Sequence, residues 1–210
     1  MGDSSTFDKE RFGLITGSKV SVLFPKRSAL VGQTTYAKEL ANQMYFRHYD
    51  NTQSWQTEHG HDGEVLAMIY WRENIDPNIE DGEFARIESW GGTSDALATD
   101  YGLDFKCPTS LNNWLDYLLM DKHLDHYDQA QMYCFLFDKP VWKIAAYLTE
   151  TMKMSDNGDR YPVKESQRMI IREIEASQDW VEKLKERSPA LIKMRDEFYK
   201  KLVEHFGENK

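Results

Sequence analysis

The sequence has few of the residues that mark several common protein classes. It contains two cysteines among 210 residues, Cys107 and Cys134, and neither belongs to a CxxC pair or to a Cys/His cluster with zinc-ligand spacing. We therefore expect reduced thiols and no disulfide framework. No apolar stretch approaches the roughly 18 residues needed to cross a bilayer. The polar segment Met1–Glu10 lacks the apolar centre of a signal peptide, so we expect a cytoplasmic protein with no membrane partner.

Basic residues and nucleotide-binding motifs are also scarce. The 26 basic and 35 acidic residues give a net charge of −9, which argues against a protein that holds nucleic acid by neutralising phosphates alone. A metal-dependent nuclease is not excluded, because such an enzyme concentrates carboxylates at its site and divalent cations reverse the local charge. One segment, from Arg11 to Ser28, is basic and contains no acid. We find no GxGxxG motif, Walker lysine loop or Ser/His/Asp signature.

The residues that are abundant predict one folded α/β domain. The 40% of hydrophobic and 13% of aromatic residues are enough for one well-buried core, so we expect a single domain over 1–210. The apolar spacing predicts helices at about 35–49, 61–73, 111–120, 127–137, 164–186 and 190–206, short strands between 83 and 106, and a buried strand at 141–148. Ser188 and Pro189 are expected to cap the last helix. The core then covers about 11–150, a C-terminal helical extension covers about 164–206, and the polar segment 152–162 is expected to be a mobile loop.

The segment from Gly92 to Pro108 carries the strongest functional pattern. Asp104 and Lys106 are two residues apart on a predicted strand, so their side chains share one face, while Leu103 and Phe105 make the other face apolar. Burial of the apolar face would direct the acid and the lysine into a cleft. Together with Asp95 they suit phosphodiester hydrolysis, in which carboxylates hold Mg²⁺ and the lysine orients or helps deprotonate the attacking water.

Two points qualify this pattern when the residues are considered alone. A third carboxylate usually completes the metal shell, and Glu64 on the preceding helix is the candidate. An isolated Asp-x-Lys is also typical of an exposed strand that carries both charges for solubility. That alternative stays open at this point.

Four segments, in order, resemble one known family. The run GTSDALATDYGLDFKCP, residues 92–108, resembles the G-x-x-DG-L…GL-E-x-K-CP signature of the YqaJ-like viral recombinases, the phage lambda exonuclease type of PD-(D/E)xK nuclease. Residues 11–18 resemble the family's R-x-G-x-I-T-x-S element. Residues 59–64 resemble its RG-x-x-x-E helix start, and residues 127–133 its Y-x-x-Q-x-Q helix. The resemblance spans about residues 11–148.

The resemblance implies a fold and a set of site residues. The fold would be a PD-(D/E)xK, restriction-endonuclease-like core with a central mixed β-sheet flanked by helices, followed here by C-terminal helices. The implied metal ligands are Glu64, Asp95, Asp104 and the Phe105 carbonyl. Lys106 would assist the water and Gln129 would support the lysine or the water. The implied ligands of a terminal 5′-phosphate are Arg11, Ser18 and Thr93.

The resemblance also implies an activity and partners. It implies Mg²⁺-dependent, 5′ to 3′ degradation of linear double-stranded DNA from a 5′-phosphorylated end, which leaves 3′ single strands for phage-type recombination. Two Mg²⁺ ions are expected, with Mn²⁺ as a substitute. The implied partners are double-stranded DNA ends, a single-strand annealing protein and two further copies in a homotrimer, in the host cytoplasm if the protein is phage-encoded.

The chain departs from the family pattern at three positions. Asp104 stands where most members have Glu, Ala96 replaces the glycine after Asp95, and His59 stands in place of Arg. None of these changes removes a metal ligand. Two alternatives follow: a structure-selective endonuclease of the same fold, or a catalytically silent DNA-end-binding protein, which the −9 charge and Ala96 favour.

Other polar and aromatic residues predict no second site. His59 and His61, with Asp62 and Glu64, could suggest a separate metal cluster, but histidines two apart lie on different sides of a helix. We expect His123 and His126 to be solvated residues at a helix end. The six tryptophans are dispersed along the chain, which favours core packing over base stacking.

Overall fold

The computed structural model describes residues 11–24, 30–48, 55–149 and 163–209. Contacts group the chain into two compact units: unit 1 is Met1–Asn51, Ala85–Gly92 and Ser177–Lys210, and unit 2 is Thr52–Phe84 and Thr93–Ala176. Because the segments of the two units alternate along the chain, length and composition could not indicate this grouping. Among the described helices, none is both long enough and apolar enough to span a bilayer.

Unit 2 is built on a five-stranded mixed sheet. The strand order is β2 (Glu80–Asp81), β5 (Ala96–Leu97), β6 (Tyr101–Lys106), β7 (Val141–Tyr147) and β8 (Met169–Glu175). β6 runs parallel to β7, and the other neighbouring strands are antiparallel. The predicted α/β class with a central mixed sheet is confirmed.

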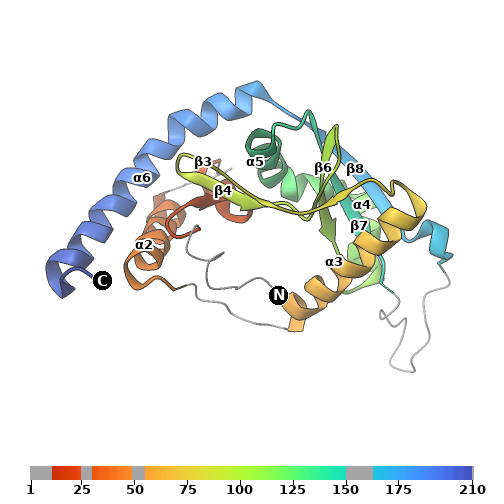
Figure 1. The fold of residues 1–210 in the computed structure, drawn as a ribbon, viewed down its shortest axis with the longest axis horizontal. Helices are drawn as coiled ribbons and strands as arrows, with labels where there is room; N and C mark the ends of the chain where they lie inside the picture. Colours follow the sequence, from red (N-terminus) through yellow and green to blue (C-terminus); the bar gives the residue numbers. More distant parts are fainter. Residues whose placement is uncertain (1–10, 25–29, 49–54, 150–162, 210) are drawn as a thin grey trace. The chain divides into compact units, whose positions relative to one another are not determined.

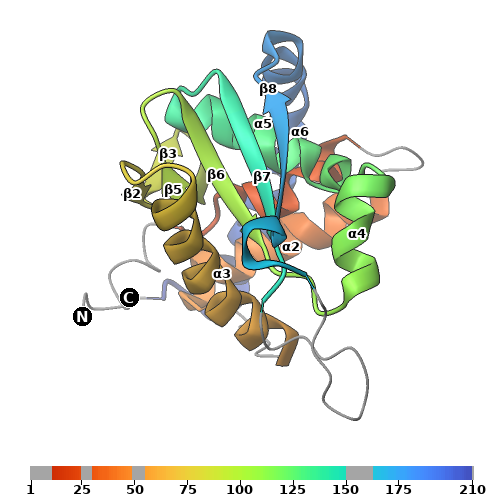
Figure 2. The same cartoon turned by 90° about the vertical axis from the view of Figure 1, so that its right-hand side faces the viewer.

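Helices cover both faces of this sheet (Figure 2). Helix α3 (Trp55–Asn74) packs its buried Ala67 and Trp71 against Leu103 and Phe105 of β6. Helices α4 (Leu111–Leu119) and α5 (Tyr127–Phe137), joined by the 3-10 helix η2 (Lys122–His126), lie on the face that carries Asp104. Strand alternation thus assigns the hydrophobic core to one side of β6 and the polar residues to the other.

Unit 1 pairs two helices and holds most of a small sheet (Figure 1). That sheet has the order β1 (Ile15–Thr16), β4 (Trp90–Thr93), β3 (Phe84–Ile87), with β1 parallel to β4. Helix α2 (Leu30–Phe46) packs along α6 (Gln178–Phe206). Two arginines of α6 donate hydrogen bonds to backbone carbonyls of the N-terminal segment: Arg195 to Gly13, shortly before β1, at 2.7 Å, and Arg187 to Leu23, the last residue of the 3-10 helix η1 (Gly17–Leu23), at 3.0 Å.

The C-terminal region differs from the predicted pair of helices. Residues 164–186 were expected to form one helix, but they contain the 3-10 helix η3 (Glu165–Gln167), strand β8 and the start of α6. The apolar residues of MIIREIE suit a helix as well as a strand. The strand forms because β7 offers a partner along its full length, and Ile170 and Ile174 are both buried there.

The prediction that Pro189 starts a new helix is wrong, because Pro189 lies inside the 29-residue α6. Ser188 is fully buried; its hydroxyl donates to the Leu184 carbonyl at 2.6 Å and accepts from Trp90 Nε1 at 3.0 Å. These bonds use Ser188 within the helix rather than as a cap. The expected loop at 152–162 lies outside the described residues.

Candidate active site

Strand β6 places an acid and a lysine side by side on the face away from the core. Asp104 is only 2% exposed, and its Oδ2 lies 2.6 Å from Lys106 Nζ. Leu103 and Phe105, on the other face, are completely or almost completely buried. The predicted alternation along this strand is confirmed, and the alternative of an exposed Asp-x-Lys strand is wrong because Asp104 is a buried residue.

Asp95, which directly precedes β5, is hydrogen-bonded to the neighbouring strand β6. It lies in the bend between β4 and β5, and its Oδ2 accepts a hydrogen bond of 2.6 Å from the Phe105 backbone N–H. Burial raises the pKa of Asp95 well above its usual value, and the negative charges of Asp104 and Glu64 raise it further. The cluster of Asp95, Asp104 and Glu64 therefore holds more negative charge than Lys106 compensates.

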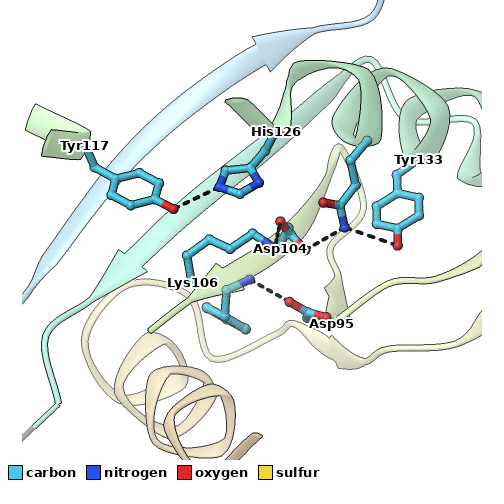
Figure 3. A network of polar contacts seen from close by, with 8 residues as sticks. Asp95, Asp104, Lys106, Tyr117, His126 and Tyr133 are labelled. Atoms are coloured by element: carbon cyan, nitrogen blue, oxygen red, sulfur yellow. Dashed lines mark hydrogen bonds and ion pairs between the residues drawn. The ribbon is translucent and has the colours of Figure 1, made fainter. Parts of the chain in front are cut away.

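Lys106 and Gln129 both interact with Asp104 (Figure 3). Burial lowers the pKa of Lys106, but the attraction and hydrogen bond of Asp104 outweigh it and raise the pKa above its usual value, so the amine is a protonated donor. Gln129 on α5 lies with its Nε2 3.4 Å from Asp104 Oδ1 and 3.3 Å from the Tyr133 hydroxyl. The amide of Gln129 thus contacts the carboxylate that also binds Lys106, and the expected support of the lysine or the water stays a prediction.

Glu64 reaches this cluster from α3. It is half-buried, and after burial itself its charge is the largest cause that raises the pKa of Cys107 to about 12. It also contributes to the raised pKa of Asp95. The charge of Glu64 thus acts on Asp95 and Cys107, and its role as a metal ligand stays a prediction.

The fit of these residues to a divalent cation depends on their donors and their orientation. Carboxylate oxygens are the ligands that Mg²⁺ prefers, and a cation would offset the excess negative charge. Within the described residues, however, no group of three or more His, Cys, Asp or Glu is arranged to hold an ion. Asp104 Oδ2 faces Lys106 and Asp95 Oδ2 faces the Phe105 N–H. The donors fit Mg²⁺, and binding requires these side chains to turn toward one point.

A tyrosine and a histidine complete the polar network, and sequence analysis missed them. The Tyr117 hydroxyl and His126 Nε2 are 2.9 Å apart, and their rings are stacked with 5° between the planes. Burial, and then the positive charge of Lys106, lower the pKa of His126 to about 4. The expectation of a solvated His126 is wrong, because η2 turns it back onto buried Tyr117. In the family pattern Y-x-x-Q-x-Q, the tyrosine lies three residues before the first glutamine. The residue three before Gln129 in this chain is His126, not Tyr127, and this spacing could have identified His126 as part of the site.

The predicted 5′-phosphate ligands are distributed over both units. Thr93 ends β4 within unit 2, and its Oγ1 is buried with no hydrogen-bond partner among the described residues. Arg11 and Ser18 belong to unit 1: the Arg11 carbonyl accepts from the Leu14 N–H at 3.2 Å, and Ser18 is an exposed residue of η1. A common phosphate pocket stays a prediction.

The structure tests some of the remaining candidate residues and leaves others as predictions. The Phe105 carbonyl as a metal ligand stays a prediction, and the side chains of His59 and His61 lie outside those described. Trp71, Trp90, Trp114, Trp142 and Trp180 are all buried, which confirms core packing for these five.

Comparison with solved structures identifies proteins of the same fold. An alkaline exonuclease, LHK-Exo, from Laribacter hongkongensis superimposes with a TM-score of 0.77 at 15% identity, over 95% of this chain and 96% of that one. A phage-related exonuclease from Haemophilus somnus 129PT gives a TM-score of 0.72 at 16% identity, over 95% and 99%. LHK-Exo in complex with dAMP gives 0.69 at 15% identity, over 95% and 96%. No protein-family model and no curated protein sequence matches the chain. The predicted resemblance is confirmed at the level of the fold.

Proposed function

We propose that this protein is a metal-dependent deoxyribonuclease that degrades linear double-stranded DNA, 5′ to 3′, from a 5′-phosphorylated end. One observation carries the proposal: Asp95, Asp104 and Lys106 converge on β6 with Gln129, in a fold shared with two exonucleases. The fold alone would not define an activity, since one fold supports many functions. The residues of the site supply the chemical argument.

Four oxygen donors form the proposed cation site. Asp95, Asp104, Glu64 and the Phe105 carbonyl would hold Mg²⁺, as two ions, with Mn²⁺ able to substitute. When bound, Mg²⁺ supplies positive charge against the scissile phosphate and lowers the pKa of water. The excess negative charge around Asp95 supports this assignment, because such repulsion is costly unless a cation or a proton relieves it.

Lys106 and Gln129 have roles that follow from their contacts. A protonated Lys106 is a donor, so its role is to orient the attacking water and to stabilise charge on the phosphate rather than to act as a base in the resting state. Gln129 contacts Asp104 Oδ1, whereas Lys106 contacts Oδ2, so the role of Gln129 is to support the Asp104 carboxylate as a ligand. Tyr133 in turn positions the Gln129 amide.

The DNA end is assigned to Arg11, Ser18 and Thr93. The buried hydroxyl of Thr93, which has no hydrogen-bond partner among the described residues, supports this assignment, because a buried polar atom costs stability unless it gains a partner. Unit 2, which contains the proposed cation site, holds well over half of the 35 acidic residues and fewer than half of the 26 basic ones, so the net negative charge of the chain belongs to this unit. The dAMP complex of LHK-Exo is in keeping with mononucleotides as products.

Two assembly properties belong to the same proposal. We assign a homotrimer, which would enclose duplex DNA, and a single-strand annealing protein, which would receive the 3′ strand. Both come from the family resemblance, and size-exclusion chromatography with light scattering tests the first.

The deciding experiment compares DNA substrates with different ends. The purified protein is incubated in Mg²⁺ with linear and with closed circular plasmid, and with linear duplexes labelled at either the 5′ or the 3′ end. We expect loss of linear DNA only, with early release of the 5′ label, and no activity from Lys106→Ala. Nicking of the circle would favour the structure-selective endonuclease. End binding without cleavage would favour the catalytically silent protein.

A further inference from the structure

The residues of helix α3 that face the sheet leave less space between helix and sheet beside Glu64, in the middle of the helix, than nearer its C-terminal end. Residues four apart lie on one side of a helix, and Gly63, Ala67 and Trp71 form the side that faces β6. At Trp71 a whole indole separates the helix from the strand, with ring centroids 6.1 Å from Phe105 and 6.2 Å from Tyr101. At Gly63 no side chain intervenes. The residues facing the sheet therefore decrease in size toward the acidic cluster.

The contact at Gly63 leaves no room for a side chain. A Cβ atom there would lie 2.5 Å from Cys107 Cβ, 2.6 Å from Cys107 Sγ and 3.3 Å from Thr149 Cγ2. The first of these atoms is bonded to the backbone and cannot rotate away. A methyl group at position 63 must therefore displace either the helix or the end of β6, where Lys106 precedes Cys107.

We propose that Gly63 is a positioning residue, whose missing side chain lets α3 bring the Glu64 carboxylate within reach of a cation shared with Asp95 and Asp104. This inference rests on the proposed function, in which Glu64 completes the ligand set. Glu64 is the next residue along the helix, so any displacement of Gly63 moves it directly. Support comes from the influence that Glu64 already has on both Asp95 and Cys107.

Helix propensity alone predicts that Gly63→Ala, the simplest substitution, is favourable rather than harmful. Alanine is a better helix former than glycine, so Gly63→Ala would stabilise α3 if the position had no steric role. The matched control is Gly32→Ala in α2, where the new Cβ would meet only the terminal Cγ2 of Val22 at 3.1 Å. The two substitutions are chemically identical and differ in what they contact.

The test measures Mn²⁺ binding by titration calorimetry on the full chain, with cleavage as a second readout. We expect Gly63→Ala to weaken Mn²⁺ binding on the order of tenfold to a hundredfold, as changes in supporting residues of metal sites do. Gly32→Ala should leave the affinity unchanged. Cys107→Gly removes both close atoms, so the double variant Gly63→Ala with Cys107→Gly should recover the affinity of Cys107→Gly alone.

Each outcome bears on the inference. Parent-like Mn²⁺ affinity in Gly63→Ala, or a loss that Cys107→Gly fails to restore, would overturn it. If Gly63→Ala does not fold, Cys107→Val enlarges the same contact from the strand side and must show the same loss of affinity. A parent protein that binds no Mn²⁺ would overturn the proposed metal chemistry and this inference together, whereas a parent that binds and a variant that matches it would overturn the inference alone.

Discussion

Asp95 accepts a hydrogen bond of 2.6 Å from the backbone N–H of Phe105, so the acid that precedes β5 is fixed to the strand that carries Asp104 and Lys106. This bond joins residues ten apart in the sequence and gives Asp95 a defined orientation beside Asp104. The same bond favours the ionised form of Asp95, whereas burial and two neighbouring carboxylates oppose it more strongly. The arrangement is ordered yet electrostatically strained, as expected where a cation is to bind.

Replacement of Asp95 by Asn should separate stability from activity. The amide oxygen can still accept the Phe105 hydrogen bond, while the repulsion from Asp104 and Glu64 disappears. We expect metal-free Asp95→Asn to gain about 1 kcal/mol in the free energy of unfolding and to lose cleavage, as is usual for strained functional sites. Chemical denaturation and DNA digestion measure the two effects. A destabilised variant, or one that cleaves at the parent rate, would contradict this account.

The raised pKa of Asp95 predicts how metal-free stability varies with pH. A carboxyl whose pKa is raised by folding contributes stability that is complete below the usual aspartate pKa and is lost as pH rises through the folded value. As the pH rises from the usual aspartate pKa through the raised pKa of folded Asp95, the melting temperature of the parent should therefore fall relative to that of Asp95→Asn. Millimolar Mg²⁺ should restore it, and more so at pH 8 than at pH 5. A gap between the two proteins that does not change with pH would refute the prediction.

His126 predicts a separate loss of stability in acid. Its pKa falls from 6.5 to about 4 on folding, so its contribution is complete above pH 6.5 and is lost as pH falls through the folded value. The difference between these two pKa values corresponds to roughly 3 kcal/mol. His126→Gln, which keeps an acceptor for the Tyr117 hydroxyl but does not titrate, should lose that much less between pH 6.5 and 4. Equal acid sensitivity of both proteins would show that the imidazole is not protected as described.

The sequence predicted the parts of the site that lie within single elements. Strand alternation placed Asp104 and Lys106 on the polar face of β6, and helical spacing gave α5 its observed bounds. The contact between Tyr117 and His126 could not be predicted in this way, since it depends on how η2 turns after α4. Likewise, MIIREIE suits a helix or a strand, and only the free edge of β7 decides between them. The fold resemblance itself came from short motifs in order, with overall identity to the solved structures of only 15–16%.

Thr93 offers a test of the proposed 5′-phosphate site in which stability and activity should change in opposite directions. Its buried Oγ1 has no hydrogen-bond partner among the described residues, so the nearly isosteric Thr93→Val should stabilise the free protein by about 1 kcal/mol. If that hydroxyl donates to a terminal phosphate, its loss removes a hydrogen bond to a charged group, worth roughly 1.5 to 3 kcal/mol, or about a tenfold to hundredfold change in rate. Initial rates on duplexes with 5′-phosphate and with 5′-hydroxyl ends measure this. The parent should prefer the phosphorylated end, and Thr93→Val should lose most of that preference while its rate on hydroxyl ends stays the same. Equal rates of the parent on 5′-phosphate and 5′-hydroxyl ends would contradict the proposed phosphate site. If Thr93→Val were equally slowed on both kinds of end, Thr93 would be assigned to the scissile bond instead.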